Sequence, residues 1–113
     1  MISVIKRTKK EAKPIFVVLC LDRLGTAHIR SQFLEAHRRY VDEQASIILS
    51  SGPLLDEDGT TRSGQMFILY VSDRQKAEAF IEADPFTTAA LFETVIIRRF
   101  APVFSNGSRQ RFL

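Results

Sequence analysis

The sequence has little that could fix a fold covalently or place it in a membrane. Cysteine occurs once in 113 residues, at Cys20, so no disulfide framework can form within the chain. No run of about 18 apolar residues is present. The apolar start, residues 2–5, stops at lysine and arginine, which predicts no signal peptide. These absences favour a protein of the reducing cytoplasm that does not cross a membrane.

The usual signatures of metal and cofactor sites are also missing. Residues 56–59 (Asp-Glu-Asp-Gly) begin like a calcium loop but lack the later ligands and the closing glutamate, so we interpret them as a hairpin turn. His28 and His37 have no zinc-site spacing. No glycine-rich loop that could cradle phosphate is present. We therefore expect neither a metal nor a cofactor.

Positive charge is concentrated at the two ends of the chain. The net charge is +3, yet the first 13 residues hold five basic side chains against Glu11 alone, and Arg109 and Arg111 lie near the other end. The residues between are therefore net acidic. We predict a flexible basic arm over residues 1–13, a folded domain over 14–104 and a polar tail over 105–113. A nucleic-acid partner is not expected.

Apolar periodicity predicts the order of elements in the folded part. Residues 15–21 form a continuous apolar run typical of a buried strand, and residues 26–43 have apolar side chains at spacings of three and four, typical of a helix. Strands follow at 45–51, closed by Gly52-Pro53, and at 65–71.

The second half repeats the pattern. Ser72 and Gln75 have the form of a capping box that opens a helix ending near residue 83. Asp84-Pro85 then starts a short helix with Asp as N-cap, and the last strand is expected over residues 94–100.

This order, βαββαβ, predicts an α+β fold of the ferredoxin-like kind, an antiparallel sheet with both main helices on one face. The strands at 15–21 and 65–71 are too apolar to leave the other face in water. A second copy of the sheet is the simplest cover, which predicts a homodimer with a shared α+β barrel. RNA-binding domains share the strand order, but Val18, Cys20 and Leu69 are poor platforms for stacking bases.

Motifs in the same order as those of the YciI-like (YCII-related) family run through residues 15–104. The sequence resembles that family at these places: His37-Arg-Arg-Tyr40, Ser51-Gly-Pro-Leu-Leu55, Asp58-Gly59, Gly64, Asp84-Pro-Phe86, Ala89-Ala-Leu-Phe92 and Val95-Ile-Ile97. The resemblance implies a ferredoxin-like dimer with a pocket near the sheet edge, and a histidine and an aspartate as a catalytic pair. His37 and Asp84 stand at the matching positions. Leu34 stands where the family often has an arginine, and Ser63-Gly64 where Gly-Ser is the usual order.

The chemistry of the two candidate catalytic residues is that of general acid and base. A histidine beside a carboxylate can accept and return a proton near neutral pH, while the carboxylate fixes its tautomer. Two structural readings stay open. His37 lies on the apolar stripe of its helix and could simply bond a backbone carbonyl, and Asp84 before Pro could act as a helix cap only.

Four further residues are candidates for contact with a substrate. Arg30 precedes His37 by two helical turns and could hold an anionic oxygen of the substrate by a bidentate contact, or lie in solvent. Tyr40 could line the pocket or pack in the core. We also expect substrate contacts at Ser63 and Gly64, although serine hydrolysis is not indicated because no nucleophile elbow is present.

Two function classes follow. The first is a small YciI-like enzyme, a lyase or isomerase, in which His37 and Asp84 transfer protons on a small, possibly aromatic molecule. The second is a module that binds a small ligand or a protein partner without catalysis.

Overall fold

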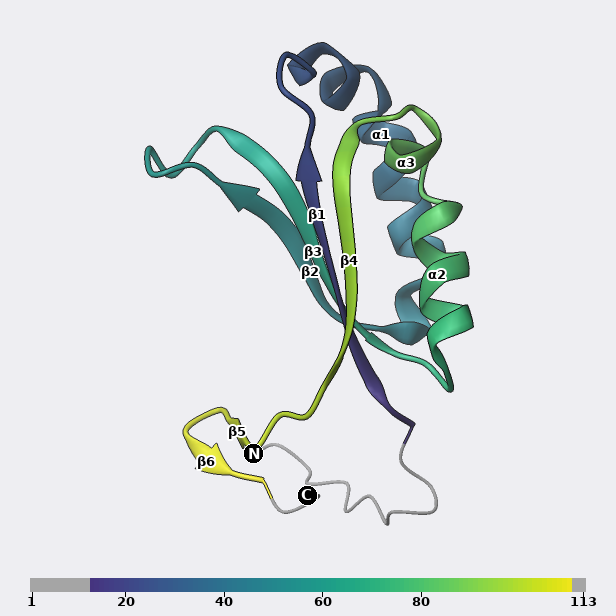
Figure 1. Cartoon of the computed structure of the whole chain (residues 1–113), viewed down its shortest axis with the longest axis vertical. Helices are drawn as coiled ribbons and strands as arrows, with labels where there is room; N and C mark the ends of the chain where they lie inside the picture. Colours follow the sequence, from purple (N-terminus) through teal and green to yellow (C-terminus); the bar gives the residue numbers. More distant parts are fainter. Residues whose placement is uncertain (1–12, 111–113) are drawn as a thin grey trace.

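The described part of the chain forms a four-stranded antiparallel sheet covered on one face by helices, and a separate two-stranded sheet (Figure 1). The computed structural model describes residues 13–110. In chain order the elements are β1 (Ile15–Asp22), α1 (Ala27–Glu43), the 3₁₀ helix η1 (Ala45–Ile47), β2 (Ile48–Leu55), β3 (Arg62–Tyr70), α2 (Arg74–Glu82), α3 (Pro85–Thr88), β4 (Phe92–Phe100), β5 (Phe104–Ser105) and β6 (Ser108–Arg109).

The main sheet has the strand order β2-β3-β1-β4, and every neighbouring pair is antiparallel. Helices α1, α2 and α3 lie on the same side of this sheet (Figure 1). This is the predicted ferredoxin-like α+β fold, which is thereby confirmed.

The core lies between the sheet and the helices. Successive strand residues point to opposite faces, so Phe16, Val18 and Cys20 of β1 face the helices and are almost completely buried. Phe67 and Leu69 of β3 lie beside them. Ala77, Phe80 and Ile81 of α2 close the core from above.

The prediction for the second strand was wrong at both ends. Residues 45–47 form the 3₁₀ helix η1, with the amide of Ile47 donating to the carbonyl of Gln44 (3.1 Å), and the strand begins at Ile48. The strand then continues through Gly52 and Pro53 to Leu55. Proline is tolerated there because β2 lies at the edge of the sheet, where one side of the strand needs no ladder hydrogen bonds.

Helix starts were predicted with mixed success. The capping box at Ser72 and Gln75 is wrong, because Asp73 is the N-cap of α2 and its side chain accepts from the amide of Lys76 (2.9 Å). The N-cap at Asp84 is confirmed. Its carboxylate accepts from the amide of Phe86 (2.9 Å), and Pro85 follows at the first helical position.

The structure describes only part of each end of the chain. Residues 1–12 of the predicted basic arm lie outside the described residues. The short strands β5 and β6 pair with each other across the predicted boundary, because β5 begins at Phe104, the last residue of the predicted domain, and the rest of the pair lies in the predicted tail. Between residues 13 and 110, no helix combines the length and the hydrophobicity that a membrane span requires.

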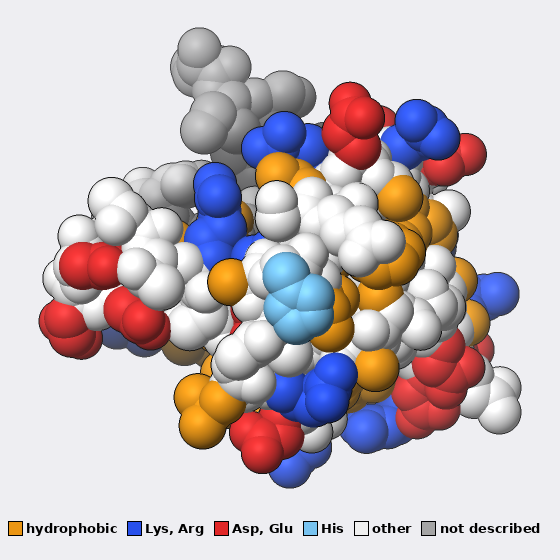
Figure 2. All heavy atoms as spheres, turned by 90° about the horizontal axis from the view of Figure 1, so that it is seen from above, with side chains coloured by type: hydrophobic (Ala, Val, Ile, Leu, Met, Phe, Trp, Pro, Cys, Tyr) orange, Lys and Arg blue, Asp and Glu red, His pale blue; other side chains and the backbone are white. Residues whose placement is uncertain are grey.

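The sheet face opposite the helices is apolar and has no covering element among residues 13–110. Its side chains alternate with those of the core, and most are half-buried: Val17, Leu19, Leu21, Met66, Ile68 and Ile96. Leu21 keeps 40% of its surface exposed. This surface, called the open face below, contrasts with the end of the molecule shown in Figure 2, where acidic and basic side chains are interspersed.

Candidate functional site

His37 and Asp84 meet although 47 positions separate them in the sequence. His37 lies in the middle of α1, and Asp84 is the N-cap of α3. The Nδ1 atom of His37 is 3.0 Å from each oxygen of the Asp84 carboxylate. Asp84 is completely buried and His37 is 5% exposed. The short helix α3 therefore places the Asp84 carboxylate beside the imidazole of His37 in α1.

The surroundings of the imidazole determine both its orientation and its tautomer. The ring of Phe86 stacks on it, with centroids 4.1 Å apart and planes inclined by 12°. A carboxylate only accepts hydrogen bonds, so Nδ1 carries the proton that is donated to Asp84. In the neutral imidazole the lone pair is then on Nε2, and no hydrogen bond to this atom is found among residues 13–110. An unpartnered, basic nitrogen is what a general base requires.

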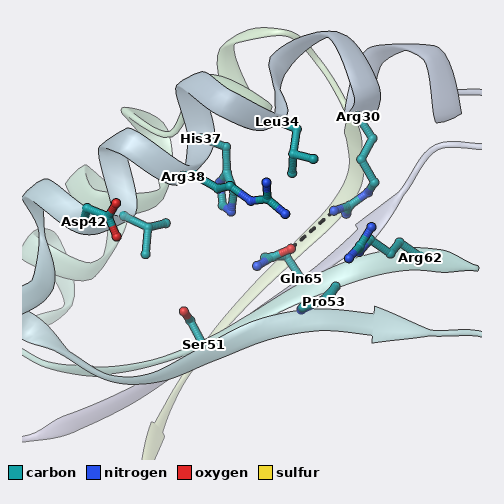
Figure 3. A pocket seen from close by; sticks show the side chains of 10 residues that line it. Arg30, Leu34, His37, Arg38, Asp42, Ser51, Pro53, Arg62 and Gln65 are labelled. Atoms are coloured by element: carbon teal, nitrogen blue, oxygen red, sulfur yellow. Dashed lines mark hydrogen bonds between the residues drawn. The ribbon is translucent and has the colours of Figure 1, made fainter. Parts of the chain in front are cut away.

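A cavity of about 280 Å³ lies beside His37, between α1 and the β2–β3 edge of the sheet (Figure 3). It has an apolar part and a cationic part. The lining residues are Arg30, Leu34, His37, Arg38, Val41, Asp42, Ser51, Pro53, Arg62 and Gln65. A small organic molecule with negatively charged oxygens suits such a lining.

Arg30 reaches the cavity, but its hydrogen bonds are made within the protein. Its Nε and Nη2 atoms donate to the two oxygens of Asp22, both at 3.0 Å. Nη2 also donates to the carbonyl of Gly64 (2.9 Å), and Nη1 donates to Oε1 of Gln65 (3.4 Å). The bidentate contact proposed for a substrate is thus made with Asp22. Arg30 ties α1 to β1 and β3 next to the cavity.

The other predicted contact residues lie apart from the cavity lining. Tyr40 packs in the core, where its hydroxyl donates to the carbonyl of Phe80 (2.7 Å) and burial, followed by the nearby Asp84 charge, raises its pKa. Of the two readings left open for Tyr40, the structure has the core packing, and Tyr40 is not among the residues that line the cavity. Ser63 and Gly64 do not line it either. Gly64 acts through its carbonyl, which holds Arg30.

Sequence reasoning missed Gln65, Arg38 and Arg62, which do line the cavity. Gln65 had a detectable signal, since it interrupts the apolar, helix-facing positions that Phe67 and Leu69 continue. The two arginines had none, because exposed arginines on a helix flank and at a strand end are common.

Cys20 lies in the core near this site but is not a nucleophile. Burial, followed by the negative charges of Asp84 and Asp22, raises the pKa of its thiol to about 12. The thiol is therefore protonated at neutral pH, and the thiolate is the form that attacks an electrophile. Within residues 13–110, no three His, Cys, Asp or Glu side chains converge in a way that could hold a metal ion.

A ferredoxin-like domain with a buried histidine–aspartate pair beside a small cavity defines the class of this protein. The sequence model of the YCII-related domain matches residues 15–101. The chain belongs to the YCII-related family, as its motifs predicted.

The solved structures similar to this one include the following two. A 5-chloro-2-hydroxyhydroquinone dehydrochlorinase from Burkholderia phenoliruptrix, in complex with 2,5-dihydroxybenzoquinone, is 28% identical with a TM-score of 0.71, over 77% of this chain and 93% of that one. The protein At3g17210 from Arabidopsis thaliana is 12% identical with a TM-score of 0.45, over 82% of this chain and 98% of that one, which is too distant to bear on the site. A search of curated proteins finds no match.

Proposed function

We propose that this protein is a small enzyme that transfers protons on a hydroxylated aromatic or keto-acid-like molecule, leading to elimination or isomerisation. The observation that carries the proposal is the environment of His37. Its Nδ1 is held by the buried Asp84, whereas its Nε2 has no partner among the described residues and the ring lines the cavity. This arrangement combines a proton acceptor with a group that supports the imidazolium formed.

The chemistry needs only one base. His37 removes a proton from a ring hydroxyl and returns it to a ring carbon, so the hydroxyl oxygen becomes a carbonyl and that carbon becomes tetrahedral. If the carbon carries a halide, His37 then removes the proton of a second ring hydroxyl. The electron pair left on that oxygen forms a second carbonyl, a ring double bond shifts, and the halide ion leaves with the electron pair of its bond to carbon. The net change is loss of one proton and one halide ion. Without a leaving group, the same first step is an isomerisation.

The cavity lining suits such a substrate. Leu34, Val41 and Pro53 provide an apolar surface for a ring, while Arg38 and Arg62 can stabilise oxygens that become negative when His37 removes a proton. Support also comes from the dehydrochlorinase, which shares the fold and acts on a ring with several hydroxyl groups.

The test is an activity assay on 5-chloro-2-hydroxyhydroquinone and related hydroxylated rings, with chloride release and the absorbance of the quinone as readouts. We expect His37→Asn to lower kcat by roughly 10²- to 10⁴-fold, the usual contribution of a general acid or base. His28→Asn is the matched control, because His28 is exposed near the start of the same helix.

Two results would contradict the proposal. The first is turnover by His37→Asn at the rate of the native protein. The second is saturable binding of these molecules without turnover of any of them. The latter would favour the alternative function, a ligand-binding module in which the same cavity only recognises its ligand.

We also infer that the protein forms a homodimer through the open face. The argument is the apolar character of the residues on β1, β3 and β4 that no described element covers. A contiguous apolar surface of this kind marks an interaction site. Because this surface is repeated on every copy, two copies can cover each other around a two-fold axis.

Light scattering at micromolar concentration should return twice the chain mass of 12.8 kDa. Ile68→Lys places a charge in the centre of the open face and should shift the protein toward the monomer. Leu24→Lys is the control, since Leu24 is 98% exposed in the loop after β1 and should leave the mass unchanged. A native protein that scatters as a monomer would contradict this inference.

A further inference from the structure

Gln65 is a polar residue in an apolar strand. It lies on β3, on the same face as Phe67 and Leu69, and opposite Cys20 of β1 and Pro53 of β2. It is 5% exposed, and its side chain lines the cavity. A buried amide costs free energy unless its hydrogen bonds are satisfied. Its position therefore needs an explanation beyond packing.

Arg30 determines which way the Gln65 amide points. A guanidinium group has donors and no acceptor, so the amide must present its oxygen to Arg30. The observed contact is of this kind, from Nη1 of Arg30 to Oε1 of Gln65 (3.4 Å). Arg30 is itself held by the bidentate contact with Asp22. The amide orientation thus follows from a chain of contacts that begins at the end of β1.

The amide nitrogen is consequently turned away from Arg30. Figure 3 shows it on the side of the cavity where His37 lies. Among residues 13–110, no acceptor is bonded to Nε2 of Gln65, nor is a donor bonded to Nε2 of His37. One cavity therefore presents an unused hydrogen-bond donor and an unused proton acceptor on the same side.

We propose that Gln65 determines substrate specificity by donating a hydrogen bond from Nε2 to a substrate oxygen, with Arg30 as the positioning residue that keeps the donor in place. The inference rests on the proposed function of His37. Together, His37 and Gln65 would select ligands in which a hydroxyl group is next to a carbonyl or an oxyanion. The hydroxyl proton goes to His37, and the neighbouring oxygen accepts from Gln65.

A suitable probe is 2,5-dihydroxybenzoquinone, because each of its hydroxyl groups is adjacent to a carbonyl carbon. Binding to the full-length protein is measured by calorimetry. Gln65→Met keeps the length of the side chain and removes the donor, and we expect about tenfold weaker binding, the usual effect of one lost hydrogen bond. Gln65→Glu replaces the donor with an anionic acceptor, so the loss should be larger. Gln75→Met and Gln75→Glu, on the exposed side of α2, should bind like the native protein.

Arg30→Lys tests the positioning role. Lysine keeps the charge but cannot hold Asp22 and Gln65 at once, so we expect weaker binding than in the native protein. If Arg30 acts through Gln65, adding Arg30→Lys to Gln65→Met should weaken binding no further. Fully additive losses would show that Arg30 does not act through the amide. Melting temperatures of all variants identify any that fail to fold, and Gln65→Met decides the question if Gln65→Glu is unfolded.

The outcomes separate this inference from the function on which it rests. Native binding that persists unchanged in both Gln65 variants overturns the role of Gln65 and leaves the role of His37 intact. Absence of binding to the native protein overturns both, since the cavity would then not accept the proposed class of ligand. Tenfold or greater weakening in the Gln65 variants, with the Gln75 variants binding like the native protein, supports the inference.

Discussion

Replacing Asp84 with alanine is expected to lower the free energy of unfolding by about 3 kcal/mol. Two losses add up to this value. The helix α3 loses its cap, the bond from the Phe86 amide to the carboxylate (2.9 Å), which contributes about 1 kcal/mol. The buried Nδ1 of His37 loses its acceptor, and an unsatisfied buried polar group costs about 1–3 kcal/mol. Urea denaturation followed by circular dichroism measures the change.

Asp73→Ala is the matched control, because Asp73 caps α2 in the same way, at the same distance of 2.9 Å, but is exposed and has no histidine partner. It should cost about 1 kcal/mol. The prediction is wrong if the two variants lose the same stability. Asp84→Asn separates the roles further, since its amide oxygen can still cap α3 while its NH₂ group can donate to Nδ1. The ¹⁵N shifts of the imidazole should then show that the proton has moved to Nε2, and activity should fall with it.

Gly64→Ala is expected to destabilise the protein by about 3 kcal/mol, at the upper end of the cost of overpacking. A Cβ atom at this position would be 2.3 Å from the carbonyl oxygen of Cys20 and 2.9 Å from Cδ1 of Leu54. The carbonyl is backbone of the paired strand β1, so relief requires β1 and β3 to separate. Thermal and urea unfolding measure the effect.

Gly52→Ala provides the comparison on the neighbouring strand β2, where an added Cβ meets nothing within 4 Å. It should change the stability by less than about 1 kcal/mol. Equal effects of the two substitutions would show that the close approach at Gly64 is not what requires glycine. Gly64→Ala should also displace the carbonyl that accepts from Arg30, so loss of ligand binding should accompany loss of stability.

The fold was predictable because local patterns agreed with one another. The apolar run before Asp22, the helical spacing that includes His37 and the Asp84-Pro85 helix start each depend on neighbouring residues alone. The predicted ends of strands and helices were wrong where contacts with other parts of the fold determine them. Pro53 is acceptable inside β2 only because that strand is at the sheet edge, and Asp73 rather than Ser72 caps α2 because the helix begins at Arg74.

The candidate site was predictable only in part, for a physical reason. Histidine and aspartate were found through the family motifs, since spacing alone cannot show that residues 37 and 84 meet. The partner of Arg30 could not be foreseen, because the pairing with Asp22 depends on the end of β1 passing close to α1. Gln65 was missed because a single polar residue in a strand can face either solvent or the core, and only the register of the strand shows which.

The double role of Asp84 links the opening of a single helical turn to the chemical state of the site. Whenever α3 frays, the carboxylate that caps it is free to leave Nδ1 of His37, and the imidazole loses the partner that fixes its tautomer. Local openings of this kind occur in every native protein at a frequency set by their free energy. Hydrogen exchange of the Phe86 amide therefore measures the fraction of molecules in which the contact between His37 and Asp84 is formed, without any substrate.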